Sequence, residues 1–316
     1  MIESNDYHLS ERDTAADPMS RAAILEDYRL CCLSRALSVL ARREVLTGKA
    51  KFATTDDGKE LLQVAMARAF RRGDFRADYY RGHTLMLALG LATVEELLAQ
   101  LYADPDGDPF SAGRQMFNHH ATPLVDARGG WTAHIQHFNI SSDISTTAGQ
   151  MARALGLALA SKKYRQLPHL AGGRFSEEGR EVCFCNIGDG STAEGAFWET
   201  LNAAGLLQVP LLISVWDDGY GISVPSEYQC VKSSISEAVQ GLQRTAGSNG
   251  IELLRVAGWD YPALCEAYRV GVRLAREEHL PVLLHVRELT QPQGHSTSGS
   301  HERYKSKERL QWEREH

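Results

Sequence analysis

Residues 181–221 read EVCFCNIGDGSTAEGAFWETLNAAGLLQVPLLISVWDDGYG, and this stretch decides the fold. Two strand-like apolar runs, 181–187 and 211–216, stand on either side of a helix-length stretch at 194–207. A strand, a helix and a second strand at this spacing form a βαβ unit, in which the two strands are parallel. Strands and helices continue to alternate up to residue 286. We therefore predict an α/β fold, a doubly wound parallel sheet with helices on both faces.

The rest of the chain is divided by its pattern into helices, strands and two long loops. The helix at 151–160 is small and apolar on every side, so we expect it to be buried. Asp260 stands where it can cap the last long helix. We expect a disordered leader at 1–20 and one domain at 21–316, with active-site loops at 104–147 and 290–305. The other elements that we expect are helices at 25–40, 57–70, 94–101, 232–246 and 261–278, and strands at 251–256 and 281–286.

The bulk composition excludes several classes of protein. A net charge of −6 argues against a general nucleic-acid surface, so we expect no nucleic-acid partner. No apolar run approaches the roughly 20 residues that a membrane span requires, and the polar N-terminus lacks the apolar core of a signal peptide. We expect a cytoplasmic protein. The six cysteines form no CxxC pair and do not suggest a disulfide framework, so we expect them to be packing residues.

Two aspartates follow the two strands of the βαβ unit. Asp189 lies between Gly188 and Gly190 and is followed by Ser191, whereas Asp218 follows the second strand. Either cluster alone fits an ordinary turn. Together they lie at the carboxyl edge of adjacent parallel strands, where open α/β sheets bind ligands. Two carboxylates beside a helix N-terminus suit a divalent cation that carries a diphosphate.

Two other patterns resemble metal sites only weakly. His134 and His137 form an HxxH pair, but no third zinc ligand follows at a recognisable spacing. The aspartates at 104, 106 and 108 lack the glycine position and the closing glutamate of a calcium loop.

The GDG…DDGYG stretch resembles the thiamine-diphosphate signature of the transketolase-like superfamily. It is more closely similar to the alpha portion of the decarboxylating component of 2-oxoacid dehydrogenase complexes, especially to bacterial forms in which the alpha and beta portions are fused. Four further motifs occur in the order of that family, and the resemblance spans roughly residues 25–310. These motifs are YYRGH at 79–83, GRQMFNHH at 113–120, STTAGQMARALG at 145–156 and GHSTSGSHERYKS at 294–306.

The resemblance implies thiamine diphosphate and Mg²⁺ as cofactors, and it implies roles for particular residues. The side chains of Asp189 and Asp218 and the carbonyl of Tyr220 would bind Mg²⁺. His119 and His295 would be the catalytic residues that face the reacting carbon, and register with the family favours His119 over His120. The other cofactor-binding positions would be Tyr80 and Arg81 at the diphosphate, Ser145 and Gln150 in the cofactor channel, and Gly188, Gly190 and Ser191 beside the metal.

The chain departs from the family pattern at several positions. Two asparagines are usual where this chain has Asp217-Asp218, and the added negative charge must be offset by Mg²⁺, Arg81, the thiazolium and His295. We therefore predict a stricter Mg²⁺ requirement. Thr147 stands where a large aliphatic residue usually supports the bent cofactor.

The pyrimidine-binding domain of the family, with its glutamate, has no counterpart after residue 293. The resemblance thus implies a separate beta subunit or a fused pyrimidine-binding domain as partner, with an α₂β₂ heterotetramer expected and little turnover by the isolated chain.

The activity implied is oxidative decarboxylation of a small-molecule 2-oxoacid, branched-chain or pyruvate, with acyl transfer to the lipoyl group of an acyltransferase. Two alternatives stay open: transketolase-like ketol transfer, and a truncated fragment without catalysis, which the ending WEREH suggests. The sequence does not decide which 2-oxoacid is used or whether Ser296 is phosphorylated.

Overall fold

The computed structural model describes residues 19–170, 172–232, 234–298 and 300–316. The leader that we expected at 1–20 lies outside the described residues, except for its last two positions.

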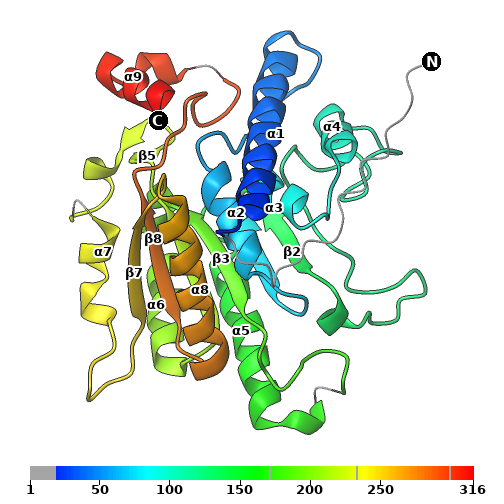
Figure 1. Cartoon of the computed structure of the whole chain (residues 1–316), viewed down its shortest axis with the longest axis vertical. Coiled ribbons are helices and arrows are strands. Elements are labelled where there is room, and N and C mark those ends of the chain that lie inside the picture. Colours follow the sequence, from blue (N-terminus) through cyan, green and yellow to red (C-terminus); the bar gives the residue numbers. More distant parts are fainter. Residues whose placement is uncertain (1–18, 171, 233, 299) are drawn as a thin grey trace.

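A parallel sheet forms the centre of the molecule (Figure 1). In the described part of the chain it has six strands in the order β2-β1-β3-β4-β8-β7. The predicted βαβ unit is present, since β3 and β4 pair in parallel from Cys183–Leu211 to Gly188–Trp216. Both strands therefore end side by side. The strand bounds are β1 Phe75–Tyr79, β2 Asn139–Ile144, β3 Cys183–Gly188, β4 Leu211–Trp216, β7 Glu252–Ala257 and β8 Val282–Arg287.

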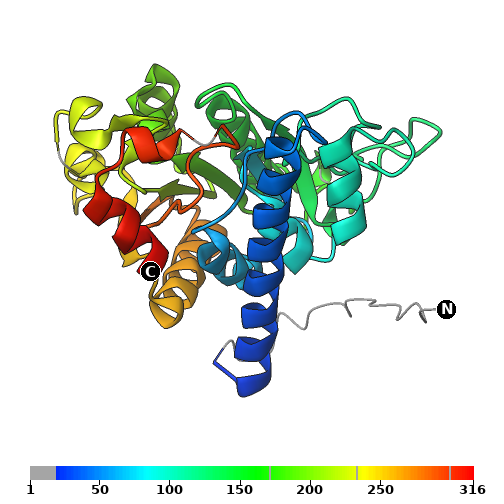
Figure 2. The same ribbon diagram turned by 90° about the horizontal axis from the view of Figure 1, so that it is seen from above.

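Helices cover both faces of this sheet, as the alternation of elements predicted (Figure 2). Successive residues of a strand point to opposite faces, so Phe184 packs in one hydrophobic core and Cys185 in the other. The first core holds α1 Arg21–Leu46, α2 Glu60–Ala69, α3 His83–Ala88, α4 Val94–Tyr102 and α8 Tyr261–Glu278. The second holds α5 Met151–Gln166, α6 Gly195–Leu207 and α7 Ile235–Ala238. The predicted cap is present, because the Asp260 side chain accepts a hydrogen bond from the Ala263 amide at 3.0 Å.

Strand β2 corrects our prediction that residues 104–147 lack regular structure. Its sequence, NISSDI, shows no apolar alternation, but Asn139, Ser141 and Asp143 are nevertheless buried. Polar partners explain this burial: Ser141 donates to the Arg76 carbonyl at 2.8 Å, and Asp143 forms an ion pair with the buried Arg76 guanidinium. The interior of this edge of the sheet is polar, and a hydrophobic pattern could not reveal it.

Two helix predictions were also wrong in part. Helix α5 buries only one face, through Met151, Ala154, Ala158 and Ser161, although residues 151–160 are small and apolar apart from Arg153. The helix expected at 232–246 is reduced to α7 and a 3₁₀ turn at Gln240–Leu242. At the C-terminus, Lys307–Glu315 form helix α9.

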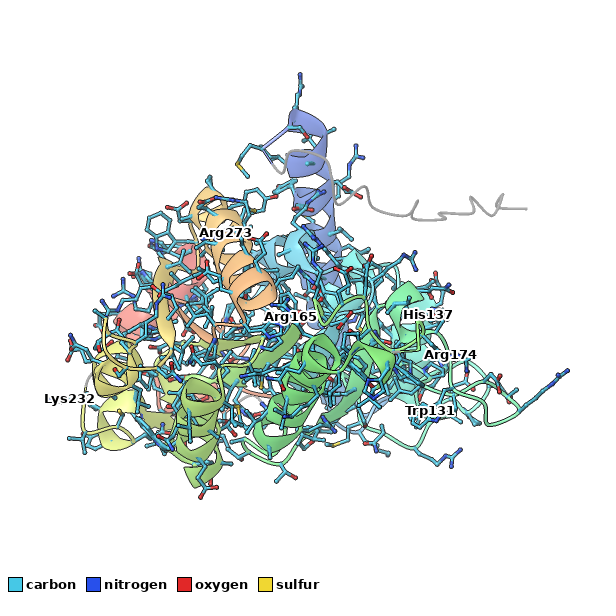
Figure 3. The ribbon with its side chains drawn as sticks, turned by 90° about the horizontal axis from the view of Figure 1, so that it is seen from below. Trp131, His137, Arg165, Arg174, Lys232 and Arg273 are labelled. Atoms are coloured by element: carbon cyan, nitrogen blue, oxygen red, sulfur yellow. The ribbon has the colours of Figure 1, made fainter. Side chains whose placement is uncertain are left out.

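Arg165 links the two helical layers at the end of the sheet opposite the strand carboxyl ends (Figure 3). From α5 its guanidinium donates to the carbonyls of Arg276 and Glu277 in α8, at 2.7 and 3.1 Å. Those carbonyls belong to the last turn of a helix and lack intrahelical partners. Within the described residues we find no helix whose length and apolar character would let it span a lipid bilayer.

Candidate functional site

A cavity of about 210 Å³ opens at the carboxyl ends of the strands. The segments that follow β1, β3, β4 and β8 line it, together with the start of α2, so residues distant in sequence meet there. The predicted residues found in the lining are Tyr80, Arg81, Gly188, Asp189, Gly190, Ser191, Asp218, Tyr220 and His295, and Thr147 also lies there.

Asp189 begins the 3₁₀ turn Asp189–Ala193 that follows β3. Its side chain is buried, but the carboxylate is not fully hydrogen-bonded. Its Oδ2 atom has no hydrogen-bond partner. Burial, together with the nearby carboxylates of Asp218 and Asp217, raises the pKa of the Asp189 carboxyl well above its usual value. An unpaired buried carboxylate oxygen of this kind is costly unless a proton or a cation satisfies it.

Gly190 brings the backbone after β3 against a second segment. A Cβ atom on Gly190 would lie 2.6 Å from the Gly221 Cα atom, so only glycine fits there. The two backbones lie together in the cavity lining beside Asp189. Glycine is therefore required here for the close packing of the two backbones, and the Gln229 side chain also lies there, with its Oε1 atom 3.0 Å from the same Cβ position.

Asp218 is the second buried carboxylate, and it has partners. Lys59 Nζ lies 2.7 Å from its Oδ2 atom, and the Tyr220 amide donates to its Oδ1 atom at 3.1 Å. Burial raises the pKa of the Asp218 carboxyl, but Lys59 and then Arg81 outweigh it, so that the pKa lies below its usual value. The two carboxylates therefore differ: the Asp189 Oδ2 atom has no partner, whereas Asp218 is paired with Lys59.

Asp217 points to a different set of partners. Its Oδ2 atom is 2.9 Å from His285 Nε2, and His285 Nδ1 is 2.6 Å from Ser236 Oγ. His285 and Ser236 are buried. This chain of hydrogen bonds connects the turn after β4 to β8 and α7.

Tyr80, Arg81 and His295 form one contact group over the cavity. Tyr80 Oη lies 3.1 Å from His295 Nε2, while Arg81 donates to the carbonyls of His295 and Thr55. Burial, followed by the charge of Arg81, lowers the pKa of His295 to about 3. In the ligand-free protein His295 is therefore neutral at physiological pH, and Arg81 is the positively charged member of this group.

His119 and His120 lie in different environments. His119 Nε2 is 2.6 Å from Ser145 Oγ, and its ring centroid is 6.4 Å from that of Tyr80. His120 is fully buried against Phe110, and its Nδ1 atom lies 3.3 Å from Asp143 Oδ2. Neither histidine is in the cavity lining itself, but His119 is the one that contacts the Tyr80 group.

Gln150, like Ser145, lies outside the lining of this cavity. Instead of lining the cavity, it is buried and donates to the Asn186 carbonyl of β3 at 2.7 Å. It precedes the first residue of α5. Gln150 thus connects that helix to the sheet.

Three basic residues at the site were not predicted. Lys59 pairs with Asp218, Arg309 donates to the Asp218 carbonyl at 2.7 Å, and Lys305 lies 5.2 Å from the Tyr220 ring centroid. They come from the start of α2 and from the C-terminal segment that contains α9. No motif marks Lys59 or Arg309 in the sequence, and Lys305 lies in the GHSTSGSHERYKS motif without a role assigned to it there. Only the basic residues of the stretch RYKSKER at 303–309 could have indicated that the C-terminal segment carries cations.

The described residues contain no group of three His, Cys, Asp or Glu side chains that could hold a metal by themselves. The donors at the cavity still fit a hard cation bound with a ligand, because Mg²⁺ commonly takes one or two carboxylates and completes its shell with phosphate oxygens and water. The unpaired Asp189 Oδ2 atom is the observation that supports this fit.

The fold and the cavity define a class: an α/β protein with two buried aspartates in a cavity partly lined by glycines, at the carboxyl edge of a parallel sheet. The family model described as dehydrogenase E1 component matches residues 28–316, and the chain belongs to this family.

Curated relatives carry names of 2-oxoacid dehydrogenases. The chain is 27% identical over 267 residues to the 2-oxoisovalerate dehydrogenase subunit alpha 2, mitochondrial, of Arabidopsis thaliana, covering 84% of this chain and 48% of that protein. It is 28% identical to the 2-oxoisovalerate dehydrogenase subunit alpha of Bacillus subtilis (81% and 68% covered). It is 24% identical to the pyruvate dehydrogenase E1 component subunit alpha, somatic form, mitochondrial, of Pan troglodytes (98% and 70% covered). The chain spans about half the length of the Arabidopsis relatives that it matches.

Proposed function

We propose that this chain is the alpha portion of a thiamine-diphosphate-dependent 2-oxoacid dehydrogenase. It would take part in the oxidative decarboxylation of a branched-chain 2-oxoacid or pyruvate, with acyl transfer to a lipoyl group. Membership of the E1 component family and the names of its relatives support this activity. The observation that carries the proposal is the unpaired, buried Asp189 Oδ2 atom in a cavity that Asp218 shares.

Asp189, Asp218 and the Tyr220 carbonyl would hold Mg²⁺. A divalent ion would satisfy the Asp189 oxygen and remove the charge repulsion that raises the pKa of that carboxyl. The amides beside Gly190, the hydroxyl of Ser191 and the guanidinium of Arg81 are the donors available to a diphosphate in the same cavity.

When bound, thiamine diphosphate supplies the electron sink that decarboxylation requires. The protein residues would orient the substrate and carry protons. His295 is neutral, so one of its ring nitrogens can donate a hydrogen bond to the substrate and the other can accept one. His119, held by Ser145 beside the Tyr80 ring, can exchange a proton with a group near that ring. Arg81 fixes the His295 backbone through its carbonyl and so keeps this histidine over the cavity.

The partners follow from the same family. A beta subunit, or a fused pyrimidine-binding domain, would cover the open side of the cavity and supply the glutamate that the cofactor ring requires. A lipoyl-bearing acyltransferase would receive the acyl group. Relatives named as alpha subunits support a second kind of chain in the assembly.

Co-expression with a candidate beta chain tests this function. The purified complex would be assayed with pyruvate and with three branched-chain 2-oxoacids, using an artificial electron acceptor, with and without thiamine diphosphate and Mg²⁺. We expect cofactor-dependent turnover of at least one substrate and none by a complex that carries Asp189→Ala. Assembly with the beta chain but no turnover of any of these acids would contradict the proposal.

A further inference from the structure

Lys59 is a buried lysine whose three ammonium protons all have protein acceptors. Its Nζ atom lies 2.7 Å from Asp218 Oδ2, 3.0 Å from Gln291 Oε1 and 3.2 Å from the Thr290 carbonyl. An ammonium group has three donors and no more. Lys59 lines the cavity, yet it has no proton left to give to a ligand there. Lys59 can therefore influence a ligand only through its charge and through its contact with Asp218.

Most of the charged side chains at the cavity are paired with a group of opposite charge. Lys59 and Asp218 cancel each other, with side chains that are 2% and 9% exposed. Lys305, which also lies near Tyr220, is itself paired with Glu313 at 2.7 Å. This leaves Asp189 as the uncompensated anion and Arg81 as the uncompensated cation in the lining.

We propose that Lys59 and Asp218 act together as one uncharged oxygen ligand, so that the metal site presents the charge of a single carboxylate to the diphosphate. The inference rests on the proposed function, because it concerns the same ion and cofactor. Lys59 is a positioning residue in this scheme: it holds the Asp218 carboxylate by one oxygen and neutralises it, while lone pairs of that carboxylate remain for the ion.

The physical reason is repulsion between the acidic ligand and the anionic cofactor. Without Lys59, two carboxylates would face a diphosphate across one ion in a buried site, where charges interact more strongly than in water. The lysine also fixes Thr290 and Gln291, which lead into the loop that carries His295. Removal of Lys59 should therefore weaken cofactor binding, and removal of the Asp218 charge should compensate.

A charge-compensation cycle tests this inference on the full chain in complex with the candidate beta chain. Four proteins would be compared: wild type, K59Q, D218N and the double variant K59Q/D218N. Their affinities for thiamine diphosphate at saturating Mg²⁺ would be measured by isothermal titration calorimetry, and folding would be checked by circular dichroism. The variant K163Q, which removes a lysine charge from the exposed end of α5, is the matched control.

We expect K59Q to bind thiamine diphosphate roughly tenfold more weakly than wild type, and the double variant to recover to within about threefold. K163Q should bind as wild type does. Wild-type affinity in K59Q, or a double variant as weak as K59Q, would overturn the inference. If K59Q does not fold, the double variant decides: binding near the wild-type value supports the inference, and a loss beyond about tenfold overturns it. Absence of binding by the wild-type complex with its beta chain would instead contradict the proposed function.

Discussion

His285 Nε2 lies 2.9 Å from Asp217 Oδ2, whereas the next residue, Asp218, pairs with Lys59. Two adjacent aspartates therefore have separate partners, one histidine from β8 and one lysine from the start of α2. The sequence suggested that the doublet would add negative charge beside a diphosphate. In the structure each carboxylate of the doublet has a basic side chain, and Asp189 is the acidic group left without one.

The Asp217–His285–Ser236 chain should stabilise the turn after β4. Removing the Ser236 hydroxyl by Ser236→Ala breaks one buried hydrogen bond and should lower the free energy of unfolding by about 1 kcal/mol. His285→Ala also leaves the Asp217 carboxylate without its partner and should cost more, roughly 2–3 kcal/mol. Urea denaturation measures both. Equal, negligible losses in the two variants would contradict a structural role for this chain.

Asp189→Asn should stabilise the metal-free protein and abolish metal binding. The pKa of Asp189 is raised in the folded state, so the folded protein loses stability relative to the unfolded chain as pH rises above the usual carboxyl range. An amide carries no charge and removes this cost, and we expect a gain of roughly 1 kcal/mol at pH 7.

Thermal melts at pH 5 and pH 7, with EDTA and with Mg²⁺ and thiamine diphosphate, would measure the effect of this substitution. The gain over wild type should be larger at pH 7 than at pH 5. Only wild type should be stabilised by the ligands. A variant that melts below wild type in EDTA at pH 7 would show that Asp189 has a partner that we have not identified.

His295 should make stability depend on pH in the acid range. Its pKa is about 3 in the folded protein and close to the ordinary histidine value when unfolded, so the unfolded chain binds the additional proton between these values. Stability should therefore rise with pH from about 3 to about 6.5 and stay level above. In the variant His295→Gln this contribution disappears. The difference between the wild-type and variant unfolding free energies, followed across that range, isolates the histidine from the carboxylates; a difference that does not change with pH would contradict the prediction.

The sequence predicted the βαβ unit and the acidic edge because both depend on strong local signals. An apolar run, a helix-length spacer and a second apolar run leave one parallel arrangement. The same rules predicted the helix at 25–40, which lies within α1, but not the face that it buries. The prediction rested on the apolar stripe Leu25, Tyr28, Cys32, Ala36 and Leu40. Leu25 and Tyr28 are exposed, however, and the buried face carries Asp27 and Ser34.

Specific polar partners explain why polar residues of α1 are buried while apolar residues of the stripe are exposed. Arg68 pairs with Asp27 at 2.9 Å, and Ser34 lies 2.6 Å from the Thr84 hydroxyl. Such partners come from distant parts of the chain, and a periodicity rule assigns polar residues to the surface. Lys59 was missed for the same reason, because its place beside Asp218 depends on how α2 packs at the sheet edge.

His119 and His120 allow a matched test of function against stability. His119 contacts Ser145 and the Tyr80 ring, so His119→Gln should fold normally and, in the complex with a beta chain, lower kcat by about 100-fold or more. His120 is buried against Phe110 and Asp143, so His120→Gln should mainly lower the melting temperature and change kcat little at temperatures where the protein is folded. The two variants carry the same substitution at adjacent positions, so each is the control for the other. The reverse result, with turnover lost in His120→Gln and retained in His119→Gln, would assign the proton-carrying role to His120 and would require a rearrangement of the loop that carries both histidines.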